Sequence, residues 1–318
     1  MTTFKEIRGT AIRSVSSDPT SPEEGQIWYN NTIGVLKGYK SLGGAWASGG
    51  NLGTARFELA GTGTQTAGLA FGAGTPGNAT EEYNGTSWSP GGNLGTARSG
   101  LGGAGTQTAG LGFGGYGPPF INSTEEYDGS TWTAGGNLGT ARFRLAGAGT
   151  QTAGLGFGGY QPSPLSISNA TEEYNGSAWA GGGNLGTPTQ YLAGAGIQTA
   201  GLAFGGSTPS TTAATGEYDG SAWTAGGNLN SARKSLAGAG TQTAALGFGG
   251  TPPITGATEK YDGTSWTTTG SMSVARNYLA GCGTQTLALA FGGNIPPASN
   301  ATEEWTDPVF AVQKITTS

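Results

Sequence analysis

The chain repeats one short motif at nearly constant intervals. The tetrad Asn-Leu-Gly-Thr begins at positions 51, 93, 137 and 184, and degenerate copies follow at 228 and 271. Successive spacings are 42, 44, 47, 44 and 43 residues, so one supersecondary unit is written six times. A period in the forties is typical of propellers and solenoids. The repeat constrains the architecture strongly but leaves the chemistry open, because one fold can serve many functions.

The residue types present limit the catalytic and metal-binding chemistry that the chain can perform. The 318 residues include no His and a single Cys, Cys282. Without imidazole, the chain lacks Ser-His-Asp and Cys-His catalytic arrangements and His-ligated metal sites. One thiol forms neither an intramolecular disulfide nor a zinc-binding Cys cluster, and Cys282 is interpreted as a small residue on a packed strand. We therefore expect no enzyme activity, no cofactor and no metal.

The charge and hydropathy of the chain argue against further classes of function. Charged residues make up 10% of the chain, the net charge is −5, and after residue 40 nine Lys/Arg face fifteen Asp/Glu. This balance argues against nucleic-acid binding, which needs a basic surface. No apolar run approaches the ~18 residues of a membrane helix, and the start MTTFKEIRGT lacks the apolar stretch of a signal peptide. We expect neither membrane insertion nor signal-directed export.

Each repeat is interpreted as four short strands. In residues 88–132, the segments SGLGGAG, AGLGFGG, TEEY and STW are separated by a polar TQT tip, a Pro-rich loop and an Asp128-Gly129 hairpin signal. Period-two alternation places Leu111 and Phe113 on one face and Gly or Ala on the other. Such a sheet nests against a copy of itself, large side chains against small ones. The unit is predicted to be a four-stranded antiparallel blade, a-b-c-d.

The ends of the repeat array favour a closed ring. A solenoid needs polar caps, and the sequence has none. The sixth copy stops at ATEEW, around Trp305, without its fourth strand, whereas GGAWASGG precedes the first copy with Trp46 matching Trp88. We expect the Trp46 strand to complete the last blade and hide an exposed edge. The predicted fold is all-β: a six-bladed β-propeller over residues 43–306, with an N-terminal β-hairpin extension (1–42) and a C-terminal tail (307–318).

The blade pattern resembles the kelch repeat. The resemblance covers residues 43–306 and rests on FGG…TEEYDGSTW…GTAR and its variants. Here the Tyr–Trp spacing is five, Ala73 replaces the second Gly of the first copy, and Gln190 is assigned to the place of the repeat Arg in the fourth copy. Kelch propellers include a copper oxidase that needs His ligands, which this chain lacks. They also include partner-binding scaffolds, and the resemblance implies that role.

The first forty residues resemble a short segment of tailed-phage virion and tail-fibre proteins. The segment reads SSDPTSPEEGQIWYNNTIGVLKGYK, and chains that join it to EEYNGTSW…NLGTAR repeats resemble structural proteins of marine phages. The resemblance implies a virion protein made in the host cytoplasm. Physically, the segment predicts a β-hairpin of residues 26–29 and 34–39. Phe4, Trp28 and Tyr29 are candidates for docking on other virion proteins.

Two sets of loops are candidate binding sites. The b-c loops differ in every copy, and those of the second and third blades carry Tyr116, Phe120 and Tyr160. Loops on a rigid scaffold often carry binding residues, although drift of unconstrained loops gives the same divergence. The a-b tips share a Gln that could form a polar six-fold ring or simply belong to a duplicated soluble turn. These residues are Gln65, Gln107, Gln151, Gln198, Gln242 and Gln285.

The recurring Glu pairs are predicted to be structural. Glu81 and Glu82 are adjacent on a strand and point to opposite faces, so salt bridging to the repeat Arg is favoured over a catalytic carboxylate pair. The function that the sequence favours is a non-enzymatic phage structural or receptor-recognition protein, such as a tail fibre, tail or capsid-surface appendage. Its expected partners are other virion proteins and a host surface glycan or protein. The alternatives are a cellular or secreted lectin-like or protein-binding kelch propeller and, less favoured, a sugar-active enzyme.

Overall fold

The computed structural model describes residues 12–23, 25–41, 43–73, 77–307 and 310–315. Over these residues all regular structure is β-strand. The chain divides into two compact units, one comprising Met1–Gly44 with Asp307–Ser318 and the other Ala45–Thr306. Within the described ranges, no helix is long and apolar enough to cross a membrane. The all-β prediction is confirmed.

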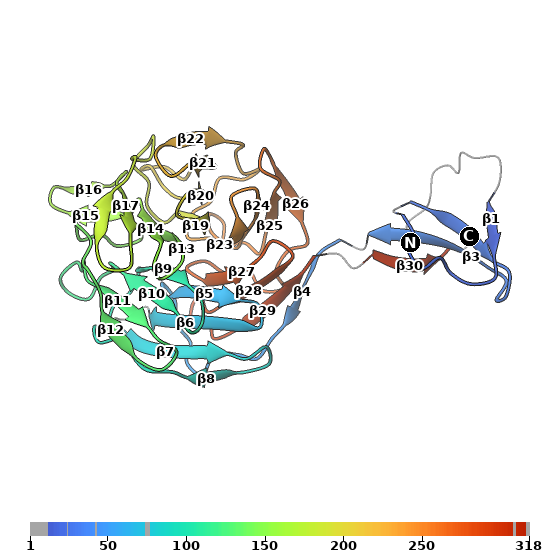
Figure 1. Ribbon diagram of the computed structural model, residues 1–318, viewed down its shortest axis with the longest axis horizontal. Helices are drawn as coiled ribbons and strands as arrows, with labels where there is room; N and C mark the ends of the chain where they lie inside the picture. Colours follow the sequence, from blue (N-terminus) through green and yellow to red (C-terminus); the bar gives the residue numbers. More distant parts are fainter. Residues whose placement is uncertain (1–11, 24, 42, 74–76, 308–309, 316–318) are drawn as a thin grey trace. The chain divides into compact units, whose positions relative to one another are not determined.

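The described part of the larger unit contains six separate four-stranded antiparallel sheets, set around a common centre in Figure 1. The first three are β5 (Ala60–Thr64), β6 (Ala67–Ala73), β7 (Gly77–Tyr83) and β8 (Trp88–Pro90); β9 (Gly102–Gly105), β10 (Gly110–Phe113), β11 (Thr124–Tyr127) and β12 (Trp132–Ala134); and β13 (Ala146–Gly149), β14 (Gly154–Phe157), β17 (Thr171–Tyr174) and β18 (Trp179–Gly181). A two-stranded ribbon, β15 (Tyr160–Pro162) and β16 (Leu165–Ile167), lies in the loop between β14 and β17.

The next two sheets are β19 (Ala193–Ile197), β20 (Ala200–Phe204), β21 (Thr215–Tyr218) and β22 (Trp223–Gly226); and β23 (Ala237–Thr241), β24 (Ala244–Phe248), β25 (Thr258–Tyr261) and β26 (Trp266–Thr269). The last consists of β27 (Ala280–Gly283), β28 (Leu287–Phe291), β29 (Thr302–Thr306) and β4 (Ala45–Ser48). The inner strands β5, β9, β13, β19, β23 and β27 contact one another in turn, and β27 contacts β5. Sheets therefore surround the centre as the blades of a propeller do.

The strand that completes the last sheet comes from the other end of the larger unit. β4 pairs antiparallel with β29, and Trp46 lies opposite Trp305. The predicted pairing of the Trp46 strand is confirmed. Without it, β29 would present an open edge of unpaired backbone groups.

Adjacent sheets nest large side chains into glycines. A Cβ atom built on Gly103 would lie 2.9 Å from the Phe71 ring, and one on Gly147 would lie 2.8 Å from the Phe113 ring. Only a residue without a side chain leaves room for these rings, which are fully buried. Burial of each Phe contributes about 1.5–3 kcal/mol. The alternation of Leu and Phe with Gly and Ala thus fixes how one sheet packs on the next.

The smaller unit contains one four-stranded sheet of order β1-β2-β3-β30. Its strands are β1 (Arg13–Val15), β2 (Ile27–Asn30), β3 (Val35–Ser41) and β30 (Phe310–Lys314). The predicted hairpin is confirmed, since β2 pairs antiparallel with β3 from Ile27 opposite Gly38 to Asn30 opposite Val35. The C-terminal segment differs from the expected tail, because β30 pairs with β3 and covers an edge that would otherwise be open.

Candidate binding site on the loop face

A ring of backbone hydrogen bonds closes at the centre of the larger unit. Each connection from strand d of one sheet to strand a of the next ends in a residue with φ between 54° and 59°. That residue directly precedes a Leu that recurs in all six copies: Leu59, Leu101, Leu145, Leu192, Leu236 and Leu279. Its N–H donates to the carbonyl of the equivalent residue in the preceding sheet over 2.6–3.0 Å, and Glu58 closes the circle by donating to Tyr278. The six residues are Glu58, Gly100, Arg144, Tyr191, Ser235 and Tyr278.

These residues combine backbone strain with side-chain diversity. The left-handed conformation costs roughly 1–2 kcal/mol for a residue with a Cβ atom, and only Gly100 lacks one. Together with the six following Leu residues, they line one cavity of about 90 Å3. Residues that vary between the copies are therefore brought together at one place. Strained positions of this kind are often functional sites.

The Arg144 side chain contacts residues of three connections in this arrangement. Its guanidinium carbon lies 4.1 Å from the Phe143 ring centroid and 4.3 Å from that of Tyr191. Its Nε donates to Glu58 Oε1 at 3.3 Å. The Tyr191 and Tyr278 ring centroids are 5.6 Å apart, and burial is the main cause that raises the pKa of Tyr191. The cation is thus held between two aromatic rings and one carboxylate.

The predicted aromatic residues gather around Phe143. The ring of Phe120 lies 5.2 Å from Phe143 and 5.6 Å from Tyr116, and the rings of Phe143 and Tyr160 are 6.3 Å apart. Backbone bridges from Ser99 to Tyr116 and from Phe143 to Tyr160 tie the d-a loops to the b-c loops. Tyr116, Phe120 and Tyr160 therefore form one patch together with Phe143 and Arg144. We call these five residues the loop-face patch.

Sequence reasoning missed Phe143 and Arg144, although a signal exists. Between the repeat Arg and the strand-a Leu, each copy carries a pair of residues that differs from copy to copy. Among the described residues, the first residue of the pair bridges to the b-c loop in five copies, and the second belongs to the backbone ring in all six. Variable pairs flanked by repeated residues mark this face as clearly as the variable b-c loops do.

The Glu pairs have two structural roles. The first Glu binds the repeat Arg of its own sheet, as in Arg56–Glu81 at 2.9 Å and Arg142–Glu172 at 2.8 Å. The second accepts a hydrogen bond from a Tyr of the next sheet, as Glu82 does from Tyr127 at 2.5 Å. The predicted salt bridges are confirmed. Among the described residues, no group of three or more His, Cys, Asp or Glu side chains is placed to hold a metal ion.

One assignment in the fourth repeat is wrong by a single residue. Thr189, not Gln190, occupies the place of the repeat Arg, since its carbonyl accepts the N–H of Gly159 at 2.8 Å. The carbonyl of Arg142 accepts the N–H of Gly115 in the same way. Gln190 is instead the first residue of the variable pair, and it bridges to Ser207.

The Gln side chains at the a-b tips join adjacent sheets. Gln107 Nε2 donates to the carbonyls of Gly68 at 3.1 Å and Tyr83 at 2.7 Å. Gln65 makes the same contact between the first and the last sheet, where its Nε2 donates to the carbonyls of Ala288 and Trp305. The amide nitrogens of Gln151, Gln198, Gln242 and Gln285 make the same pair of bonds. Binding at this ring stays a prediction, and the nitrogens already serve the scaffold.

The three predicted docking residues differ in their placement and exposure. Phe4 lies outside the described residues. Trp28 is fully buried, contrary to the expectation that it is available to a partner, because it points to the opposite face of β2 from Tyr29. Tyr29 is 41% exposed. Cys282 is buried, which raises the pKa of its thiol to about 12 and suits a packing role.

Comparison with known proteins leaves the family open: neither a protein-family model nor a curated protein sequence matches the chain.

Proposed function

We propose that this chain is a non-enzymatic structural or receptor-recognition protein of a tailed-phage particle. In this proposal a kelch-like propeller displays the loop-face patch to a host surface glycan or protein. The observation that carries the proposal is the concentration of divergence in the b-c loops and the variable pairs. Residues in the core recur from sheet to sheet, whereas the b-c loops of the second and third copies and the variable pair Phe143-Arg144 meet in one aromatic and cationic patch.

The chemistry of the patch suits recognition. Tyr, Phe and Arg are enriched at protein interfaces, and Tyr buries a large area at low entropic cost. Tyr116 is 37% exposed, and Leu165, at the end of the neighbouring β15–β16 ribbon, is 68% exposed. The Arg144 cation is pre-positioned by its two rings, so binding need not order it.

A binding comparison tests the role of the face. We expect Tyr116→Ser with Tyr160→Ser to weaken binding to host cells by about tenfold or more, because aromatic anchors dominate interface energies. The matched control is Ile197→Ser with Leu287→Ser, which changes residues at the a-b tips that are 52% and 47% exposed. If the control pair weakens binding and the tyrosine pair does not, the loop face is not the recognition surface.

The attachment of the protein to the particle is proposed to use the smaller unit. Exposed Tyr29 is the described docking candidate, and residues 1–42 hold five of the fourteen Lys/Arg. A chain without residues 1–42 should fold its larger unit but fail to enter particles, as measured by mass spectrometry of purified virions. Full incorporation of the shortened chain refutes this attachment. Absence of the intact chain from virions favours the cellular or secreted binding protein instead.

A further inference from the structure

The fourth sheet lacks the buried ion pair that the other five sheets share. Thr189 stands where they have Arg, and Gly216 stands where they have the first Glu. Gly216 pairs with Ala203 on β20, as Glu81 pairs with Ala70 on β6. Both partners of the pair are therefore replaced together by small uncharged residues.

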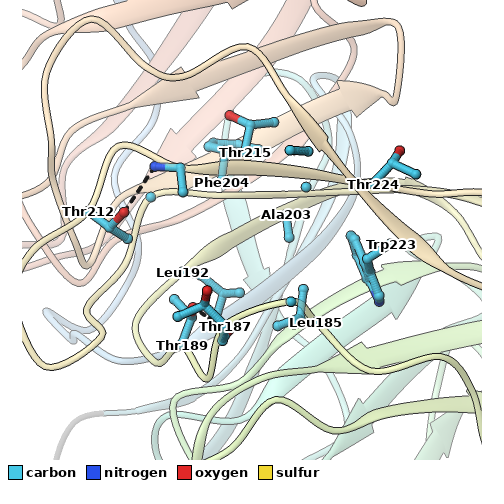
Figure 2. Close-up of a pocket in the computed structure, with 15 residues that line it drawn as sticks. Leu185, Thr187, Thr189, Leu192, Ala203, Phe204, Thr212, Thr215, Trp223 and Thr224 are labelled. Atoms are coloured by element: carbon cyan, nitrogen blue, oxygen red, sulfur yellow. Dashed lines mark hydrogen bonds between the residues drawn. The ribbon is translucent and has the colours of Figure 1, made fainter.

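A cavity of about 180 Å3 occupies this place, and Figure 2 shows the residues around it. Apolar side chains of Leu185, Leu192, Phe204 and Trp223 form much of its wall. Five threonines also line it, Thr187, Thr189, Thr212, Thr215 and Thr224, and the hydroxyls of the last four make hydrogen bonds within the chain. None of the residues that line it is charged. The cavity is thus uncharged and largely apolar.

The backbone around the cavity keeps the groups that bind Arg and Glu elsewhere. In the first sheet, Arg56 donates to the carbonyls of Gly72 at 2.9 Å and Ala79 at 2.7 Å, and Glu81 accepts the N–H of Gly53 at 2.7 Å. The equivalents in the fourth sheet are Gly205, Ala214 and Gly186, which all line the cavity. In the part of the chain that the structure describes, no side chain bonds to the Gly186 N–H or the Gly205 carbonyl.

The uncharged wall, the Gly186 N–H and the Gly205 carbonyl limit which ligands this cavity can bind. A charged ligand would meet no opposite charge in the wall, so its desolvation would be uncompensated. A purely apolar ligand would cover a backbone donor and acceptor without bonding to them. A neutral ring that carries hydroxyl groups satisfies both conditions. A six-membered ring fits, since an apolar cavity of about 150 Å3 accommodates benzene.

We propose that this cavity binds a single pyranose unit of a neutral sugar. The C–H groups of the ring pack on Leu185 and Trp223, one hydroxyl accepts from the Gly186 N–H, and another donates to the Gly205 carbonyl. This proposal does not rest on the proposed function, because its variants leave the loop-face patch unchanged. The two can therefore fail separately.

The test uses the full chain and methyl glycosides of glucose, galactose, mannose and N-acetylglucosamine. Saturation-transfer NMR and calorimetry should detect binding of at least one glycoside, with Kd on the order of 1 mM. Thr189→Arg with Gly216→Glu restores the ion pair of the other sheets and fills the cavity. This variant should bind the same glycoside at least about tenfold more weakly, a loss of about 1.4 kcal/mol.

A second variant, Thr189→Leu, fills the cavity without adding charge and keeps the test valid if the double variant does not fold. Thermal unfolding establishes which variants are native. The proposal is overturned if no glycoside binds, if binding survives filling in a folded variant, or if methylguanidinium displaces the sugar. Displacement by that cation would show that the cavity prefers the charge of the missing Arg.

Discussion

The Arg142 guanidinium is enclosed by its own sheet. It donates to the carbonyls of Gly158 at 2.8 Å and Ala170 at 2.7 Å, and it binds Glu172 at 2.8 Å. We expect Glu172→Gln to lower the free energy of unfolding by about 3–5 kcal/mol, because it leaves a buried cation without its counter-charge. Urea denaturation measures this loss. Replacing both partners, by Arg142→Met with Glu172→Leu, should cost less; a larger cost for the double variant would contradict the argument.

Some residue-scale chemistry could be predicted from the sequence, and some could not. The Arg–Glu bridges could, because both partners recur in register. The Glu58–Arg144 contact could not, since its partners are 86 residues apart and belong to copies that differ there. Gln190 was assigned to the place of the repeat Arg, whereas counting between the flanking Leu185 and Leu192 gives Thr189. Where the copies diverge, counting positions from the flanking repeated residues therefore aligns them better than matching residue types does.

At the scale of elements, Asp18 organises the sheet of the smaller unit. Its carboxylate accepts hydrogen bonds from Lys37 at 2.6 Å, Asn30 at 3.0 Å and the Trp28 indole at 3.0 Å. The Lys37 bond foremost, then those of Asn30 and Trp28, lower the pKa of Asp18 from 3.8 to about 2. Because the folded pKa is depressed, this stabilisation is present above pH 3.8 and is lost as the pH falls through about 2.

We expect the Trp28 indole resonance to titrate in that acidic range, as followed by NMR. Asp18→Asn should abolish this transition and weaken the sheet at neutral pH, because the Lys37 pair disappears. The matched control is Glu23→Gln, which should leave the titration unchanged. A Trp28 resonance that is insensitive to pH between 4 and 2 would show that Asp18 does not hold the sheet together.

Local elements were easier to predict than distant pairings. The β2–β3 hairpin and the tips of the sheets join residues close in sequence, and turn residues mark them. The Asp128-Gly129 pair predicts a hairpin, and the structure gives Gly129 a φ of 92° there. Pairing of β3 with β30 was not predicted, because it joins Lys37 to Lys314 and neither segment repeats. Alternation of large and small residues identifies a strand, but it does not show which distant strand pairs with it.

At the scale of the whole molecule, closure depends on the strand that carries Trp46. Its indole donates to Thr258 Oγ1 at 3.0 Å and packs on Phe248 and Trp305. Trp132 makes the equivalent bond to Thr80, but β12 is continuous with its own sheet. We expect Trp46→Ala and Trp132→Ala each to lower stability by about 3–5 kcal/mol. Only Trp46→Ala should speed amide hydrogen exchange in β29, because β4 can then detach; equal exchange in both variants would argue against closure by β4.

Alkaline pH should loosen the ring of sheets at several interfaces together. Five tyrosines donate across successive interfaces to the second Glu of the preceding sheet: Tyr83, Tyr127, Tyr174, Tyr218 and Tyr261. Burial first, and then the bond to Glu, raises the pKa of each from 10.0 to about 12. Each raised pKa means that the neutral hydroxyl is favoured by folding. Its contribution is complete below pH 10 and disappears as the pH rises through about 12.

We therefore expect one steep alkaline transition, in which tyrosinate absorbance rises as the far-ultraviolet circular dichroism of the sheets is lost. Tyr127→Phe removes one of the five titrating groups and should make that transition less steep. The sixth interface supplies the control, because Trp305 replaces Tyr there and its indole donates to the Gln285 carbonyl at 2.9 Å without titrating. Because Lys260 stands where the other sheets have the second Glu, Trp305→Tyr would lack that carboxylate acceptor and should change the steepness of the transition less than Tyr127→Phe does. If all tyrosines ionise near pH 10 while the sheets stay folded, their hydroxyls do not join the sheets, and the packing of Phe on Gly holds the ring without them.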